Sequence, residues 1–285
     1  LIALTRLTLD QPERAVAYGR RAREAAPGSA EAAHALGRAA VAAGDYTWAR
    51  SVLLEAAALA GDDPLVRRDL AEASLLCGRV DESRREATKA GDATFVSLLD
   101  VYRGDKGVQQ ARAILDAATA SSAESPAFRL AAAKLASPDG AKAAYRALME
   151  AYPRWGLPVR ELAALLVESG ETGDEPLQMA QRARELLQDD PAARRILGVA
   201  WAKRGLFAQA APLLEGAVSA NPADPLALYW LAACQGEAGQ FAKATETLQR
   251  ARDAGLPPGT RPRSGTTDES VGGIPPAIIA NLFSK

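Results

Sequence analysis

A pattern of small and large apolar residues recurs along this chain at a nearly constant interval, and it limits the fold more than any other feature. The pattern is Ala-x3-Leu-x2-Ala, as in ARSVLLEA at 49–56 and AAPLLEGA at 210–217. These three positions lie on one face of an α-helix. Small residues at both ends let a second helix approach, and the larger residue between them fills the space. Copies of the pattern, some of them imperfect, follow one another at intervals of 28–34 residues and end at Ala22, Ala56, Ala90, Ala118, Ala151, Ala183, Ala217 and Ala251.

A second predicted helix precedes the pattern in most copies. Four such segments end in Gly, namely 30–44, 64–78, 191–205 and 225–239. Gly at this point favours a left-handed turn into the next helix. Asp63 and Asp190 stand just before a Pro, which is typical of an N-cap followed by the first helical residue. Because 64 of the 285 residues are Ala, the best helix former, we predict an all-α chain of helix pairs.

These helix pairs resemble the tetratricopeptide repeat, whose signature is W-x2-L-G-x2-Y…A-x3-F…P. The residues that carry the resemblance are Leu36, Gly37, Gly44, Tyr46, Ala49, Leu53 and Ala56, then Leu197, Gly198, Gly205, Phe207, Ala210, Leu214, Ala217 and Pro222, and finally Leu231, Gly239, Phe241, Ala244, Leu248 and Ala251. The Trp position of the signature is not kept and holds Ala33, Arg67, Arg194 and Leu228. The resemblance implies a right-handed α-solenoid of about eight helix-turn-helix repeats, with the first helix of each repeat lining a concave groove.

The predicted domain organisation is a superhelix followed by a tail. Residues 1–254 form the superhelix, in which the first repeat is truncated and the repeats near 91–175 are irregular, with short first helices. Residues 255–285 contain a linker rich in Pro, Gly and Ser and a short apolar segment. A repeat stack exposes an apolar end unless something covers it. We therefore expect residues 274–283 to cap the stack or to mediate self-association, the alternative being a disordered end or the stub of a further domain.

Composition and motifs argue against several classes of function. The formal net charge of -1 and the 5% aromatic content do not suit nucleic-acid binding. No apolar run is long enough for a direct membrane span. The chain has one His and two Cys, Cys77 and Cys234, at expected packing positions, and it lacks CxxC, HExxH and phosphate-loop motifs. We therefore predict no catalytic residues, no cofactor and no metal site.

The groove that the resemblance implies gives the candidate binding residues. Groove-facing positions are the second, fifth, ninth and twelfth of each first helix, as the family implies. We select from them Glu31, His34, Arg38, Arg68, Glu72, Arg195, Val199 and Tyr229. The three Arg side chains could bind carboxylates of a peptide, because a guanidinium offers a bidentate fork. A clamp for a C-terminal carboxylate built on Asn is not expected, since Asn221 and Asn281 both lie outside the first helices.

The leading hypothesis is a non-enzymatic scaffold or adaptor that binds a peptide or helix of a protein partner in its concave groove. A second is an assembly or secretion helper at a membrane whose N-terminal anchor is missing. A third is an interaction domain cropped from a larger enzyme or regulator. The sequence leaves the compartment open between cytoplasm and periplasm.

Overall fold

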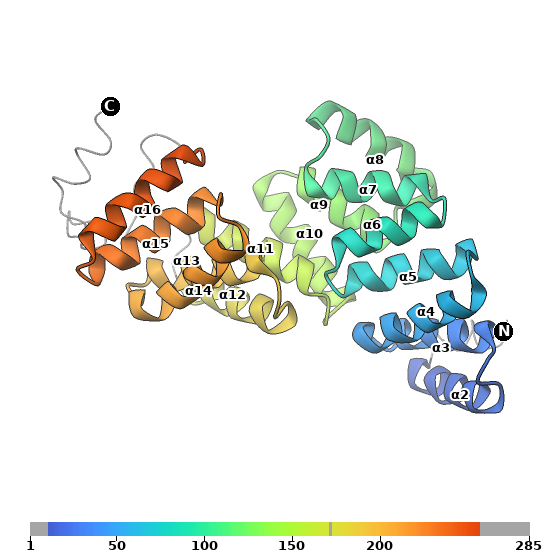
Figure 1. Cartoon of the computed structure of the whole chain (residues 1–285). Coiled ribbons are helices and arrows are strands. Elements are labelled where there is room, and N and C mark those ends of the chain that lie inside the picture. The colour runs from blue at the N-terminus through green and yellow to red at the C-terminus, as the bar shows by residue number, and fades with distance from the viewer. Residues whose placement is uncertain (1–10, 171–172, 257–285) are drawn as a thin grey trace. The chain divides into compact units, whose positions relative to one another are not determined.

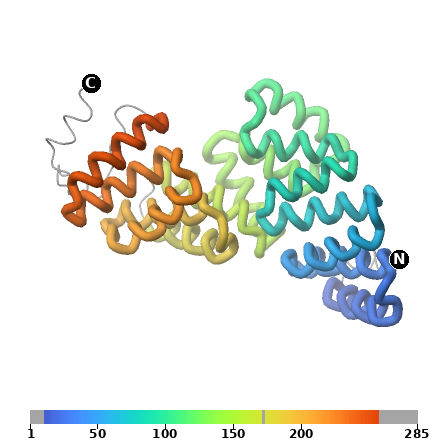
Figure 2. The backbone as a smooth tube through the Cα atoms, viewed as in Figure 1, coloured from blue at the N-terminus to red at the C-terminus, as the bar shows by residue number. Residues whose placement is uncertain are grey.

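The structure is a computed structural model that describes residues 11–170 and 173–256. Within these ranges it contains helices and turns but no strand, which confirms the all-α prediction. The chain divides into two compact units, Leu1–Pro158 and Val159–Lys285. Figures 1 and 2 trace the helices of each unit in chain order. The predicted tail segment 274–283 lies outside the described residues and stays a prediction.

Unit 1 is a series of hairpins in which each helix packs against the next one in the chain (Figure 1). Its helices are α2 (Pro12–Ala25), α3 (Ala30–Ala42), α4 (Tyr46–Ala60), α5 (Pro64–Leu76), α6 (Val80–Lys89), α7 (Ala93–Arg103), α8 (Val108–Ser122), α9 (Pro126–Leu135) and α10 (Pro138–Ala151). The first helices of successive hairpins also touch. Helix α3 contacts α5, and α7 contacts α9. In addition α5 contacts α9 directly, although a whole hairpin lies between them in sequence.

Unit 2 repeats the same packing. Its helices are α12 (Glu175–Leu186), α13 (Pro191–Lys203), α14 (Phe207–Ala220), α15 (Pro225–Glu237) and α16 (Phe241–Asp253), and they follow α11 (Gly156–Ser169), in which the division between the units falls. Each of α12 to α15 packs against the next helix, and the first helices α13 and α15 also touch.

The turns and caps form as the sequence predicts. Gly44 and Gly205 have φ angles of 75° and 74°, the left-handed region that Gly adopts without strain. At the helix starts, Asp63 accepts a hydrogen bond from the backbone N–H of Leu65 at 2.8 Å, and Asp190 accepts one from Ala192 at 2.8 Å. These side chains satisfy backbone donors that would otherwise lack a partner.

The recurring Leu-Gly pair has a direct packing role. A Cβ atom added to Gly37 would lie 2.5 Å from Cγ of Leu53, and one added to Gly198 would lie 2.8 Å from Cγ of Leu214. Both Leu side chains are fully buried. Helices α3 and α13 therefore need Gly at this point, because the large residue of the Ala-x3-Leu-x2-Ala pattern occupies the space.

The buried face agrees with the predicted register in most copies but not in the fifth. Ala210, Leu214 and Ala217 are buried as expected. In α10 the buried residues are instead Ala141, Tyr145 and Leu148, and the predicted end residue Ala151 is exposed. This prediction was wrong because the many Ala residues of α10 allow two registers, and the buried face is the one that places the large Tyr145 ring in the core.

Two helices in the middle of the chain are short, whereas α11 has 14 residues. Helices α7 and α9 have 11 and 10 residues, whereas α3, α5, α13 and α15 each have 13. The connection between α11 and α12 spans 170–174, compared with 204–206 between α13 and α14. The irregularity predicted for the repeats near 91–175 stays a prediction.

Two buried carboxylates in unit 1 should make its stability depend on pH. Burial opposes the ionisation of Glu86, but hydrogen bonds and charges from Lys89 and Arg67 outweigh it and lower its pKa. The hydrogen bond from Arg84 at 2.7 Å similarly lowers the pKa of Asp100. Both pKa values are lower in the folded chain than in the unfolded chain, so the ionised carboxylates stabilise the fold at any pH above their ordinary pKa values. This stabilisation is lost as the pH falls below about 4 and the carboxylates become protonated. Urea unfolding at neutral and acidic pH should show this loss, and Glu86→Gln should reduce it. An equal pH dependence in the parent chain and the variant would contradict the assignment to Glu86.

Candidate partner-binding site

Two of the predicted groove residues in unit 1 are brought close together by one carboxylate. His34 Nε2 lies 2.6 Å from Oδ2 of Asp69, and Arg38 Nε lies 3.5 Å from the same oxygen. His34 and Arg38 belong to α3, and Asp69 belongs to α5 next to Arg68. Asp69, which the sequence analysis did not single out, therefore links the first helices of two neighbouring hairpins.

On α3 and α5, the side chains of Arg38 and Arg68 are more exposed than the carboxylates with which they pair. Arg68 Nε lies 3.3 Å from Oδ2 of Asp92. The side chains of Arg38 and Arg68 are 46% and 57% exposed, whereas those of Asp69 and Asp92 are 31% and 22% exposed. Both guanidinium groups approach their carboxylates most closely through Nε.

The two predicted Glu residues differ in their surroundings. The Ser29 hydroxyl donates a hydrogen bond to exposed Glu31 and lowers its pKa. Burial raises the pKa of Glu72, and the neighbouring Asp69 raises it further, against the opposing charges of Arg68 and Arg38. Glu72 is therefore harder to ionise than an exposed Glu.

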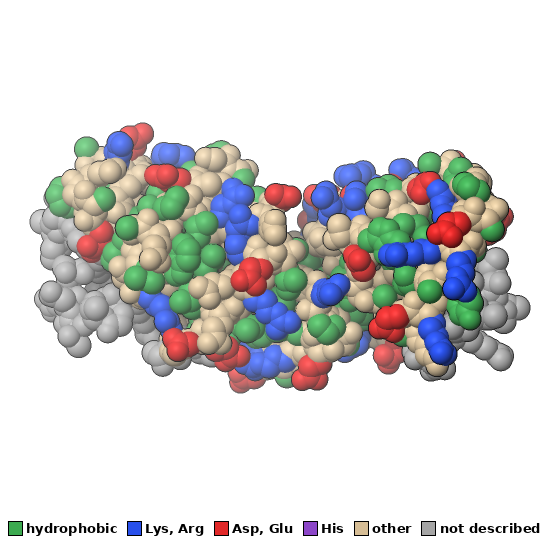
Figure 3. Space-filling view, turned by 90° about the horizontal axis from the view of Figure 1, so that it is seen from below, with side chains coloured by type: hydrophobic (Ala, Val, Ile, Leu, Met, Phe, Trp, Pro, Cys, Tyr) green, Lys and Arg blue, Asp and Glu red, His purple; other side chains and the backbone are tan. Residues whose placement is uncertain are grey.

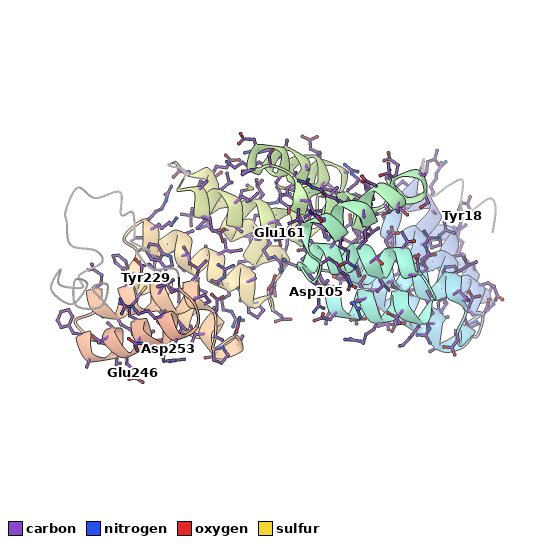
Figure 4. The ribbon with its side chains drawn as sticks, turned by 90° about the horizontal axis from the view of Figure 1, so that it is seen from above. Tyr18, Asp105, Glu161, Tyr229, Glu246 and Asp253 are labelled. Atoms are coloured by element: carbon purple, nitrogen blue, oxygen red, sulfur yellow. The ribbon has the colours of Figure 1, made fainter. Side chains whose placement is uncertain are left out.

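The predicted groove residues of unit 2 are more shielded. Arg195 is 18% exposed and lies between Oδ2 of Asp224 at 3.2 Å and Oε1 of Glu168 at 3.9 Å. Val199 is 6% exposed and Tyr229, on α15 (Figure 4), is 5% exposed. Burial raises the pKa of Tyr229. Because these side chains are so little exposed, they offer a ligand little surface to contact.

One arrangement recurs between neighbouring first helices. An Arg at the fifth residue of a first helix binds the Asp that caps the next first helix, in the pairs Arg68–Asp92 (3.3 Å), Arg160–Asp190 (2.7 Å) and Arg195–Asp224 (3.2 Å). The same Asp accepts backbone hydrogen bonds at the start of its helix, where negative charge is favoured. The sequence predicts the caps at Asp63 and Asp190 but not the Arg–Asp pairs. The sequence does contain a sign of these pairs, because an Arg stands at the fifth residue of one first helix and an Asp stands just before the next first helix.

The segment after α10 reaches the end of α5. Trp155 has no exposed surface, and its Nε1–H donates a hydrogen bond to the carbonyl of Leu75 at 2.9 Å. The rings of Tyr152 and Trp155 meet edge to face, with their centroids 5.6 Å apart. Leu75 is the twelfth residue of its first helix, a position that the family resemblance implies to face the groove. Trp155 could not be identified from the sequence, because no sequence pattern links residues 80 positions apart.

The two cysteines lack the lowered pKa of a reactive thiol. Burial raises the pKa of Cys77, and it raises that of Cys234 to about 12, so neither thiol forms a thiolate readily at neutral pH. Among residues 11–170 and 173–256, no group of three His, Cys, Asp or Glu side chains could hold a metal ion. Over the same ranges, no helix has the length and apolar character needed to cross a bilayer.

The surface mixes both signs of charge. On the face shown in Figure 3, Lys and Arg side chains alternate with Asp and Glu and surround small apolar areas in each unit. A surface of this kind suits specific contacts with another protein more than binding to a uniformly charged polymer.

Comparisons with known proteins agree with the repeat. Residues 202–256 match the family model described as tetratricopeptide repeat, which confirms the predicted resemblance in this part of the chain. No curated protein matches the chain in sequence. Among solved structures, the APC/C hetero-tetramer Cut9-Hcn1 is similar with 11% identity and a TM-score of 0.40, over 98% of this chain and 48% of that one. The P58(IPK) TPR domain has 13% identity and a TM-score of 0.42, over 89% and 71%. The chain spans about half the length of the first of these structures.

Proposed function

We propose that this chain of tetratricopeptide-type hairpins is a non-enzymatic scaffold that binds a peptide or helix of a partner protein along its first helices. The tetratricopeptide fold supports a protein-protein interaction role in general, because stacked repeats offer an extended surface. The proposed contact residues are Glu31, His34, Arg38, Arg68 and Glu72 in unit 1 and Arg195, Val199 and Tyr229 in unit 2. The last two contribute through the shape of the surface.

The outward position of Arg38 and Arg68 is the observation that carries the proposal. They lie on the first helices of consecutive hairpins, and their carboxylate partners are more buried than they are. A guanidinium that only stabilised the fold would contribute most if its own carboxylates enclosed it, as the carboxylates of Asp224 and Glu168 enclose Arg195. We therefore assign the main contact to the α3–α5 face of unit 1.

Charge reversal tests this assignment. The double variant Arg38→Glu/Arg68→Glu should retain at least about tenfold less partner than the parent chain in quantitative affinity capture from a native lysate, because desolvated charge contacts are lost and replaced by repulsion. The control Arg85→Glu/Arg112→Glu makes the same change in net charge at exposed positions of the second helices α6 and α8. If both variants retain the same partners in the same amounts, the groove assignment is wrong.

A further inference from the structure

Helix α15 of unit 2 is buried on every side. From Ala227 to Gly236, every residue except Gln235 is buried. Each residue of a helix is turned by about 100° from the one before, so residues 227–236 point in all directions. Helices α13, α14 and α16 pack against α15. The described residues contain no later first helix that would cover its remaining side, because they end in the turn after α16.

The remaining side of α15 is the one that carries Tyr229. In three pairs of first helices, the fifth residue of one helix binds the capping Asp of the next, as Arg195 of α13 binds Asp224. Tyr229 is the fifth residue of α15 and therefore lies on the side where a following element would pack. Ala233 and Gly236 lie within about 40° of Tyr229 around the helix axis, since they follow it by four and seven residues. All three are buried and form what we call the Tyr229 stripe, with one ring and two small residues.

The Tyr229 hydroxyl lacks a hydrogen-bond partner in the described part of the chain, although its oxygen is buried. Tyr229 is only 5% exposed, and its ring meets that of Trp230 edge to face, with the centroids 5.5 Å apart. Most buried hydroxyls in folded proteins are hydrogen-bonded, because an unpaired one costs free energy. Burial raises the pKa of Tyr229, so the hydroxyl keeps its proton at neutral pH and can donate a hydrogen bond. The stripe therefore suits an apolar segment that brings a free acceptor, such as a backbone carbonyl.

We propose that residues 274–283 of the same chain bind α15 along the Tyr229 stripe, and that one of their backbone carbonyls accepts the hydrogen bond of the Tyr229 hydroxyl. This inference does not rest on the proposed contact of unit 1 with a partner. The sequence suggests that this segment either caps the stack or mediates self-association. The inference selects binding within one chain and names the helix that is bound.

The segment has the chemistry that this stripe requires. Its apolar side chains are Ile274, Ile278, Ile279, Leu282 and Phe283. Pro275 and Pro276 carry no N–H and favour extended backbone, so carbonyls in this run are left for an outside donor. The 17 residues between Leu256 and Ile274 span up to about 55 Å when extended, well over the roughly 20 Å length of α15. The segment can therefore reach the stripe of its own chain.

A peptide added in trans tests the site. The probe is a fluorescein-labelled peptide of residues 272–285, and its binding to the whole chain and to variants of it is measured by fluorescence polarisation. The parent chain should bind it at least about tenfold more weakly than Ile278→Glu/Ile279→Glu, because its own segment competes at an effective concentration of about 1 mM. In that variant background, Tyr229→Phe should weaken binding about fivefold by removing the hydrogen bond, and the control Tyr18→Phe should leave it unchanged. Equal binding by the parent and the double variant, or no effect of Tyr229→Phe, would overturn the inference.

Crosslinking within the whole chain tests the same contact without a change of charge. A photoreactive phenylalanine analogue replaces Phe283, and the tryptic fragments joined by irradiation are identified by mass spectrometry. We expect an adduct on α15, in the tryptic fragment 205–243, and in a species with the mass of one chain. An adduct that joins two chains, an adduct confined to other helices, or no adduct would overturn the inference. None of these results bears on the proposed contact at α3 and α5, which the variant Arg38→Glu/Arg68→Glu tests separately.

Discussion

A Trp155→Ala variant is expected to have a free energy of unfolding about 3–5 kcal/mol lower than that of the parent chain, which is the range for removing a large buried ring. Trp155 has no exposed surface and connects the segment after α10 to the end of α5. The Leu75 carbonyl also accepts a hydrogen bond from the backbone N–H of Gly78 at 2.9 Å, so it keeps one partner in the variant. The loss should therefore come mainly from the cavity rather than from an unsatisfied carbonyl. Urea denaturation measures it.

Two further variants separate the contributions at this position. Trp155→Phe keeps an aromatic ring but loses the N–H donor, so it should lose less than Trp155→Ala, with about 1 kcal/mol of its loss coming from the hydrogen bond. Tyr18→Ala, at a Tyr on α2 that is 51% exposed (Figure 4), should stay within about 0.5 kcal/mol of the parent chain. A Trp155→Ala variant as stable as Tyr18→Ala would contradict the packing of Trp155 in unit 1.

A Leu214→Ala variant should lose about 2–5 kcal/mol in unit 2. Leu214 is fully buried and occupies the space that a side chain at Gly198 would need, because a Cβ there would lie 2.8 Å from Leu214 Cγ. The variant leaves a cavity beside Gly198. Gly198→Ala alone should also be destabilising, by about 1–3 kcal/mol, since it forces the two helices apart.

The double variant tests whether these two residues act as a pair. In Gly198→Ala/Leu214→Ala the new methyl group enters the space that Leu214 vacates. The double variant should therefore be more stable than the sum of the two single losses predicts, by about 1 kcal/mol or more. Thermal or urea unfolding of all four chains gives this coupling. Strictly additive losses would show that the helices do not interlock at this point.

Much of the fold could be predicted because it is repeated. A single Gly such as Gly44 says little, but Gly at the same place in several copies, before the same pattern, predicts the turn. Pairs such as Asp190 and Pro191 predict helix starts for the same reason. The register failed in α10, where abundant Ala left two faces possible and only the packing of Tyr145 distinguishes them. Local pattern thus determines where helices begin and end better than which face they bury.

The candidate site was less accessible to sequence reasoning. The groove positions came from the family resemblance, and in unit 1 they do bring His34 and Arg38 to one shared carboxylate. That carboxylate, Asp69, could not be identified from spacing, because its role depends on how two separate helices pack. Trp155 was missed for a stronger reason, since its partner lies 80 residues away in a different repeat.

Site-specific photocrosslinking tests most directly the central claim that a partner binds the first helices. A photoreactive residue replaces Leu65, an exposed residue at a predicted groove position on α5, and in a second chain it replaces Arg85, an exposed position on α6. After irradiation in native lysate, we expect a discrete adduct from position 65 that the Arg38→Glu/Arg68→Glu background removes, and no such adduct from position 85. An adduct from position 85 with none from position 65 would contradict the claim.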